Sequence, residues 1–266
     1  MAAIESRAFD ARRPVDLTLV LACYNEGPAL AENVATIVDV LDQCRWSYEL
    51  LFIDDCSVDD DTSASIHELV EAYPEHQIRA DFHAQNQGRG ATVVEGMRAG
   101  RGAIVGFIDI DLEVHARYVP SCVRAVELGA DVATAQRNYK FRWHSIDRYI
   151  LSSGYILLVR ALLKVRIDDT ETGFKFFRKH RILPVFDQTE DRRWFWDTEV
   201  MVRAALGGLR IHEIPVLFLR RPDKKSTVRP LSDTLNYFRR LWRFRTAVAD
   251  LRRGELGASA VRDRTW

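Results

Sequence analysis

Short apolar runs alternate along the chain with longer segments in which apolar residues recur every three or four positions. The short runs suit strands that are buried on both faces of a sheet, and the longer segments suit amphipathic helices. The strand-like runs occupy 17–21, 48–53, 78–83 and 103–108. The helical segments occupy 28–44, 62–72, 88–100 and 116–128. This alternation predicts an α/β fold with a doubly wound, mostly parallel sheet and flanking helices.

The second half of the chain is less regular. Its pattern predicts a strand at 131–135, helices at 145–165 and 197–206, and a strand at 209–219. The most apolar stretch, Tyr149–Leu163, is shorter than the roughly 20 residues that a membrane-spanning helix needs. We therefore expect a mostly buried helix there rather than a membrane span.

A long amphipathic helix is predicted at the C-terminus, over 231–253. Its apolar stripe includes Trp242, and arginines occupy much of the remaining surface. These arginines are Arg239, Arg240, Arg243, Arg245, Arg252 and Arg253. Aromatic side chains interleaved with cations are typical of a helix that lies on an anionic membrane surface. The alternative is a helix packed on the rest of the protein with solvated arginines.

Composition places the chain among ordinary soluble proteins. Of its 266 residues, 47% are hydrophobic and 29% are charged, so it can bury a sizeable core. Because its formal net charge is zero, bulk electrostatics gives no argument for a nucleic-acid partner. The four cysteines lack metal-binding spacing and the N-terminus is polar. We therefore expect reduced thiols, no secretory signal and a cytoplasmic location.

The most informative chemistry follows the run 103–108, where Asp109 and Asp111 bracket a single isoleucine. Ligands of open α/β sheets bind at the carboxyl ends of the strands, where these two carboxylates would emerge. Two close carboxylates repel each other unless a cation neutralises them, and Mg²⁺ or Mn²⁺ with a diphosphate is a common solution. A helix cap or a solvated turn would explain the same short pattern without a metal.

Polar residues also follow two other predicted strands. The sequence Ala22-Cys23-Tyr24-Asn25-Glu26 ends the first strand, and Asp54-Asp55-Cys56-Ser57 ends the second. Carboxylates at such positions can accept hydrogen bonds from ribose hydroxyls or base N–H groups. The three strand ends together therefore predict one rim of a nucleotide-binding sheet.

These motifs together resemble the family 2 glycosyltransferases with the GT-A fold, in particular the polyprenyl-phosphate mannosyl- and glucosyltransferases. The resemblance covers about residues 15–230. In order, the matching segments are Tyr24-Asn25-Glu26, Asp54-Asp55-x-Ser57-x-Asp59, Asn86-x-Gly88-Arg89-Gly90, Asp109-Ile110-Asp111-Leu112-Glu113, Asp169-Thr170-x-Thr172-Gly173-Phe174-Lys175, Trp196-Asp197-x-Glu199 and Glu213-Ile214-Pro215-Val216. Three positions depart from the pattern: Ala22 replaces a proline, and Arg89 and Thr227 each replace a lysine.

The resemblance implies a nucleotide-diphosphate sugar as donor, either GDP-mannose, UDP-glucose or UDP-GlcNAc. It implies that Mg²⁺ or Mn²⁺ is held by Asp109, Asp111 and Glu113. The residues implied to bind the donor are Ala22, Tyr24, Glu26, Asp54, Asp55, Asp109, Ile110, Asp111, Arg137, Arg221 and Ser226. The residues implied to act in catalysis, with inversion at the anomeric carbon, are Asp111, Arg137, Asp197 and Glu199.

A polyprenyl phosphate is the acceptor that the resemblance implies. The residues implied to bind it are Arg148, Ser152, Asp169, Thr172, Gly173 and Lys175. A lipid phosphate is already anionic at neutral pH, so it needs positioning more than a general base. If the acceptor is instead a hydroxyl of a sugar, peptide or natural product, Asp197 or Glu199 would have to remove its proton. A hydrogen-bonding role for Glu199 at its helix N-terminus is a further alternative.

Four regions are predicted along the chain. Residues 1–14 form a flexible arm, 15–113 the nucleotide-binding half, 114–230 the acceptor half, and 231–266 the basic helix and tail. A non-catalytic nucleotide-binding protein would be expected to have lost the metal motif, but Asp109 and Asp111 are present. A nucleotidyltransferase would be expected to carry a glycine-rich basic loop after the first strand, but Tyr24–Pro28 is not such a loop.

Overall fold

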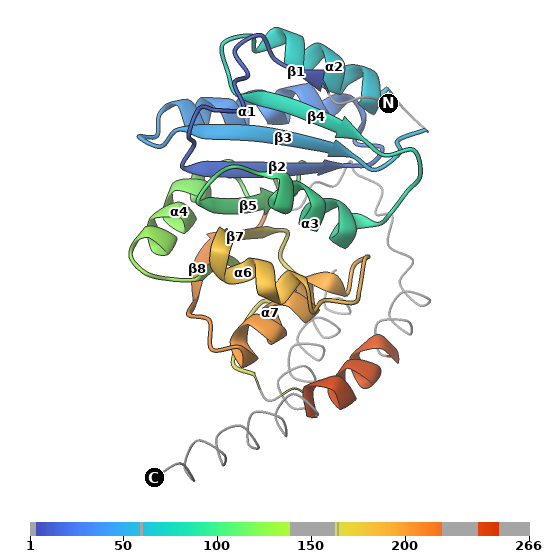
Figure 1. Cartoon of the computed structure of the whole chain (residues 1–266), viewed down its shortest axis with the longest axis vertical. Coiled ribbons are helices and arrows are strands. Elements are labelled where there is room, and N and C mark those ends of the chain that lie inside the picture. The colour runs from blue at the N-terminus through green and yellow to red at the C-terminus, as the bar shows by residue number, and fades with distance from the viewer. Residues whose placement is uncertain (1–3, 59–60, 139–162, 164, 220–238, 250–266) are drawn as a thin grey trace. The chain divides into compact units, whose positions relative to one another are not determined.

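The computed structural model describes residues 4–58, 61–138, 163, 165–219 and 239–249. The chain forms two compact units. The first comprises Met1–Tyr139 and Asp169–Arg221, and the second comprises Lys140–Asp168 and Pro222–Trp266. The candidate site lies in the first unit, whose helices and strands, apart from β6, are labelled in Figure 1.

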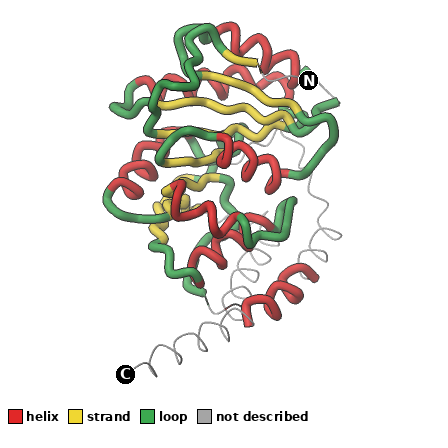
Figure 2. The backbone as a smooth tube through the Cα atoms, in the orientation of Figure 1, coloured by secondary structure: helices red, strands yellow, loops and turns green. Residues whose placement is uncertain are grey.

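An eight-stranded sheet forms the centre of the first unit, in the order β1-β4-β3-β2-β5-β7-β6-β8 (Figures 1 and 2). Its strands are β1 (Ile4–Glu5), β2 (Leu17–Cys23), β3 (Tyr48–Asp54), β4 (Ile78–Phe82), β5 (Ile104–Ile108), β6 (Val132–Asn138), β7 (Phe174–Arg178) and β8 (Ile211–Leu217). β1 pairs antiparallel with β4, and β7 pairs antiparallel with both β5 and β6. The other pairs are parallel, which confirms the predicted mostly parallel sheet.

Helices cover both faces of this sheet. One face is covered by α1 (Leu30–Asp42), α2 (Thr62–Ala72) and α4 (Val119–Glu127), whose buried residues share a core cluster with alternate residues of the strands. The other face carries α3 (Arg89–Ala99), α6 (Lys179–Phe186) and α7 (Trp196–Leu206). On that side α3 approaches Val20 through Gly96, and Trp196 of α7 contacts Phe107 of β5.

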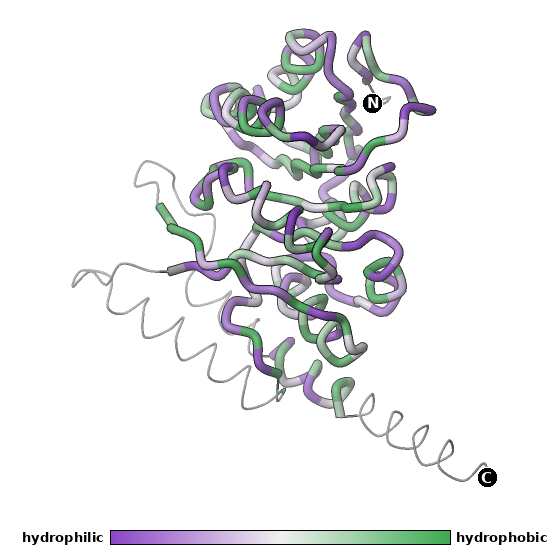
Figure 3. Tube along the Cα trace, turned by 90° about the vertical axis from the view of Figure 1, so that its left-hand side faces the viewer, coloured by the Kyte–Doolittle hydropathy of each residue, from purple (hydrophilic) through white to green (hydrophobic). Residues whose placement is uncertain are grey.

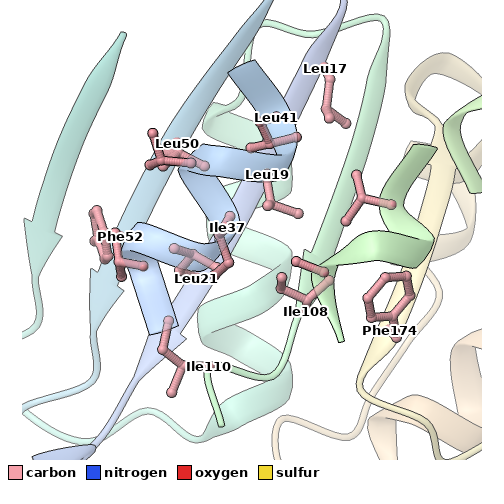
Figure 4. Close-up of a cluster of buried hydrophobic side chains, with 14 of the residues drawn as sticks. Leu17, Leu19, Leu21, Ile37, Leu41, Leu50, Phe52, Ile108, Ile110 and Phe174 are labelled. Carbon is pink, nitrogen blue, oxygen red and sulfur yellow. The ribbon is translucent and has the colours of Figure 1, made fainter. Parts of the chain in front are cut away.

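The pleat of the strands explains how one sequence supplies both cores. In β2, Leu17, Leu19 and Leu21 face α1, while Thr18 and Val20 face α3. Figure 4 shows side chains of α1 gathered over these leucines. Figure 3 shows hydrophilic and hydrophobic residues alternating along the helical turns, as expected of helices with one solvated face.

The N-terminal segment differs from the flexible arm that the sequence suggests. Ile4 and Glu5 pair with β4, and the backbone N–H of Ser6 donates to the carbonyl of Ile78 at 2.8 Å. The N–H of Ala8 donates to the carbonyl of Pro74 at 2.8 Å. Backbone pairing of this kind fixes residues 4–8 along the sheet edge, where polar sequence alone predicts no order.

Two further elements were not predicted. The apolar pattern of β7 is interrupted by the charged Lys175, and α6 contains Pro184, so the sequence pattern predicts neither element. The predicted helix 145–165 lies outside the described residues except for 163 and 165. Of the predicted helix 231–253, residues 239–249 are described and are helical.

Candidate active site

The carboxyl ends of β2, β3 and β5 lie at the same edge of the sheet. β2 pairs in parallel with β3 up to Cys23 and Asp54, and with β5 up to Val20 and Phe107. The segments that follow β2 and β3 are also joined directly. The N–H of Asn25 donates to Ser57 Oγ at 2.9 Å, and the N–H of Glu26 donates to Thr62 Oγ1 at 2.8 Å. The structure thus brings together the strand ends that the sequence singled out.

Tyr24 and Asn25 form the turn at the end of β2. Asn25 has a φ of 54°, in the left-handed region that asparagine tolerates better than most residues. Its side-chain oxygen accepts from the N–H of Val58 at 3.1 Å, which joins the turn to the loop after β3. Tyr24 is 45% exposed beside this junction.

The carboxylates of Asp54 and Asp55 are buried and hold loops. Asp54 accepts hydrogen bonds from the hydroxyls of Ser57, at 2.5 Å, and Ser63. Asp55 accepts from the backbone N–H groups of Gln87, at 2.7 Å, and Gly88, at 2.9 Å. Both were expected to contact a donor directly. In the structure their side chains hold the loops around the rim, and direct contact with a donor stays a prediction.

Asp109 lies immediately beyond β5. Its N–H donates to the carbonyl of Gly173 at 2.8 Å, and its side chain is 48% exposed. A Cβ atom added to Gly173 would lie 1.8 Å from Oδ2 of Asp109, so a side chain there would displace this carboxylate from its present position. Gly173 therefore lies directly against the Asp109 carboxylate.

The donor atoms of this motif fit a divalent cation that is shared with a diphosphate. Mg²⁺ prefers oxygen ligands and is commonly held by one or two carboxylates together with substrate phosphates. Asp109 and Asp111 offer such oxygens, and Asp109 is open to solvent. Among the described residues no group of three acidic, histidine or cysteine side chains could hold a metal ion. The expected three-carboxylate set with Glu113 is therefore not brought together.

Asp197 and Glu199, the candidate bases, are both buried in the first turn of α7. Glu199 accepts from the N–H of Asp191 at 2.8 Å and from Nε of Arg203 at 2.8 Å. Asp197 accepts from Nη1 of Arg89 at 2.5 Å and from Nζ of Lys175 at 2.7 Å. Both carboxylates are therefore engaged by cations and, in the case of Glu199, by a backbone N–H group.

Lys175 was expected to contact the acceptor, but it is fully buried in β7. Its ammonium group donates to Asp197 and to the carbonyl of Thr172, and it lies 5.6 Å from the centre of the Phe107 ring. Burial lowers the pKa of Lys175, while the charge of Asp197 opposes that effect. Lys175 thus acts as the internal counter-ion of Asp197. The Thr172 hydroxyl is buried as well and has no hydrogen-bond partner among the described residues.

Arg137 and Asp169, on β6 and just before β7, form a two-pronged ion pair. Nε of Arg137 donates to Oδ2 of Asp169 at 2.6 Å, and Nη2 donates to Oδ1 at 2.9 Å. The guanidinium also lies 5.6 Å from the centre of the Phe218 ring. Burial alone would raise the pKa of Asp169, but the charge and hydrogen bonds of Arg137 bring the pKa below its ordinary value. Asp169 therefore orients Arg137 at the carboxyl end of β6.

Several predicted site residues cannot be placed. Arg148, Ser152, Arg221 and Ser226 lie outside the described residues. Sequence reasoning also missed one residue, Arg89, whose guanidinium donates to Asp109 at 2.5 Å. The available signal was its position in the Asn86–Gly90 motif, where it replaces a lysine.

The family model for glycosyl transferase family 2 matches residues 18–201. The chain belongs to this family. It is 31% identical over 217 residues to glycosyltransferase AglD of Haloferax volcanii, a match that spans 79% of this chain and 34% of that protein. It is 26% identical to the dolichyl-phosphate β-glucosyltransferase of Dictyostelium discoideum, over 77% of this chain and 68% of that one. The Saccharomyces cerevisiae protein of the same name is 25% identical, over 75% and 66%.

Solved structures of glucosyl-3-phosphoglycerate synthase from Mycobacterium tuberculosis share the fold of this family 2 member. One aligns with a TM-score of 0.64 at 16% identity and covers 88% of this chain and 79% of its own. At this identity the likeness concerns the fold, which is the GT-A fold that the resemblance predicted. The chain thus belongs to a family of glycosyltransferases, in agreement with the prediction from its motifs.

Proposed function

We propose that this family 2 glycosyltransferase moves a hexosyl group from a nucleotide-diphosphate sugar to a polyprenyl phosphate. The observation that carries the proposal is its similarity to two dolichyl-phosphate β-glucosyltransferases over at least three quarters of its length. UDP-glucose is accordingly the first donor to test, followed by GDP-mannose and UDP-GlcNAc. The chain matches 68% and 66% of those two relatives, so the activity of the whole protein is part of the proposal.

The donor would bind across the edge formed by β2, β3 and β5. The exposed Tyr24, with Ala22 and Glu26, would contact the base or ribose, while Asp54 and Asp55 hold the surrounding loops. Asp109 and Asp111 would hold Mg²⁺ or Mn²⁺ against the diphosphate, and the cation would stabilise the charge of the leaving group. The Mycobacterium tuberculosis protein with this fold was crystallised with Mn²⁺ and UDP-glucose, which supports this arrangement.

A phosphate acceptor agrees with the state of the acidic residues. Its oxygen would attack the anomeric carbon as the bond to the diphosphate breaks, which releases a nucleoside diphosphate and inverts the anomeric centre. No proton has to be removed from such a nucleophile. A hydroxyl acceptor would need a base, but Asp197 and Glu199 are committed to cations and backbone N–H groups. Arg137, with Arg148 and Arg221, would provide positive charge for the phosphates.

Contact with a membrane surface is also proposed, through the basic helix. Within 239–249 the side chains of Leu241, Phe244 and Val248 are buried, whereas Trp242 is 60% exposed. Exposed arginines flank Trp242, and Arg245 lies over its ring at 4.8 Å. This combination suits the headgroup region of an anionic bilayer at the cytoplasmic face. Within the described residues no helix is long and apolar enough to cross a bilayer.

Radiolabelled donors test the proposal directly. The protein is incubated with Mg²⁺ and labelled UDP-glucose, GDP-mannose or UDP-GlcNAc, with and without polyprenyl phosphate. We expect label in an organic-extractable, acid-labile lipid for one donor, and no such product from Asp111→Asn. Donor hydrolysis without a lipid product, or transfer only to a water-soluble hydroxyl, would contradict the proposal.

A further inference from the structure

Arg89 connects the metal motif to a buried carboxylate. Its Nη2 atom donates to Oδ1 of Asp109 and its Nη1 atom donates to Oδ2 of Asp197, each at 2.5 Å. The guanidinium lies 5.1 Å from the centre of the Phe107 ring and 5.4 Å from that of the Trp194 ring. Only 13% of the Arg89 side chain is exposed. Its position is thus fixed by two carboxylates and two aromatic rings.

Arg89, Lys175, Asp109 and Asp197 form two pairs of opposite charge. Lys175 and Asp197 are both buried and form an ion pair at 2.7 Å, so they neutralise each other without Arg89. The charge of Arg89 is consequently balanced by Asp109, which is the more exposed of the two carboxylates. The first carboxylate of the metal motif therefore has a permanent cation beside it.

A guanidinium suits this bridge better than a lysine ammonium group would. Its planar fork carries separate N–H groups that can reach two carboxylates at once, whereas an ammonium is a single point of charge. The two aromatic faces add cation–π attraction and limit movement. Arg89 is therefore held in place even when Asp109 binds something else.

We propose that Arg89 is a built-in counter-cation of the metal motif, which makes the enzyme bind its divalent cation together with the nucleotide diphosphate. A free divalent cation would meet the positive charge of Arg89 beside Asp109, which disfavours its binding. A diphosphate brings further oxygen ligands and negative charge, which offset that repulsion. The inference rests on the proposed assignment of Asp109 and Asp111 to the metal.

Binding of Mn²⁺ alone to the donor-free protein provides the test, with electron paramagnetic resonance reporting free Mn²⁺. We expect Arg89→Met to bind Mn²⁺ about tenfold more tightly than the wild type, because a unit charge near the site is removed. Addition of UDP should raise the Mn²⁺ affinity of the wild type by a larger factor than that of the variant. Arg98→Met is the matched control, because Arg98 lies on the same helix and pairs with the exposed Asp187 at 2.6 Å.

The variant should fold, because Lys175 still neutralises Asp197, and thermal unfolding checks this. Arg89→Gln is a second variant that removes the charge but keeps hydrogen-bond donors. An unchanged or weaker Mn²⁺ affinity in both variants would overturn the role of Arg89. Adding Asp109→Asn to Arg89→Met should abolish the gain. If the gain persists, the cation binds elsewhere, and the metal assignment fails separately from the polyprenyl-phosphate proposal.

Discussion

Gly173 and Asp109 show how one backbone position determines the site. The N–H of Asp109 donates to the carbonyl of Gly173, and the Asp109 carboxylate occupies the space that a Cβ on Gly173 would need. We predict that Gly173→Ala displaces Asp109 and lowers kcat/KM at least about tenfold, because a misplaced metal ligand weakens stabilisation of the leaving group. Gly207→Ala is the control, since the nearest atom to its Cβ would be 3.3 Å away. Equal activity of the two variants would refute the steric argument.

The Arg137–Asp169 pair makes a prediction about pH. The folded-state pKa of Asp169 is lowered, so the pair contributes stability above about pH 4, and this contribution is lost as the pH falls through the folded-state pKa. Arg137→Met leaves a buried carboxylate without its cation, at a cost of about 3 kcal/mol at pH 7. The variant can relieve that cost by protonating Asp169, so its deficit should shrink between pH 7 and about pH 4. Urea unfolding at several pH values measures this, and a constant deficit would contradict it.

At the level of elements, the sequence predicted most of the sheet because its strands are apolar and its helices are amphipathic. The segment 62–72 was predicted with the bounds that α2 has, and the strand ends meet as expected. β7 was missed because Lys175 is buried by pairing with Asp197, a contact between segments 22 residues apart. Long-range polar pairing is what the sequence pattern does not contain.

The buried ion pair between Glu49 of β3 and Arg101, which also binds the N-terminal segment, makes a prediction about stability. Glu49 of β3 is fully buried and accepts from Nε of Arg101 at 2.7 Å, while Arg101 also donates to the carbonyl of Asp10 at 2.5 Å. Arg101→Met should cost about 3 kcal/mol of unfolding free energy, because it removes the cation of a buried carboxylate. Arg45→Met is the control and should leave the urea midpoint almost unchanged, since Arg45 is 66% exposed. Similar losses in the two variants would contradict the buried-pair argument.

At the scale of the whole molecule, the basic helix makes a prediction about membrane binding. Replacing the exposed Arg239, Arg240 and Arg243 by glutamine should lower the affinity for anionic vesicles roughly a hundredfold, as measured by co-sedimentation. Each cation near such a surface contributes about 1 kcal/mol to binding. Binding of the wild type should fall at high salt and be weak on neutral vesicles. Unchanged binding of the triple variant to anionic vesicles would show that this helix is not the contact.

The central claim concerns the acceptor, because the family fixes the reaction class and the fold but leaves the nucleophile open. The site gives a chemical reason to test a phosphate first: Arg137 lies at the carboxyl end of β6, and both candidate bases are held by other groups. A phosphate and a hydroxyl on the same lipid separate the two possibilities without changing the hydrophobic part of the acceptor.

The most direct measurement is therefore the initial rate of labelled glucose transfer from UDP-glucose to polyprenyl phosphate and to the matching polyprenol, with Mg²⁺ and the unmodified chain. The account predicts transfer to the phosphate and none to the alcohol. Transfer to the polyprenol at a comparable rate, or to neither lipid with any of the three donors, would contradict it.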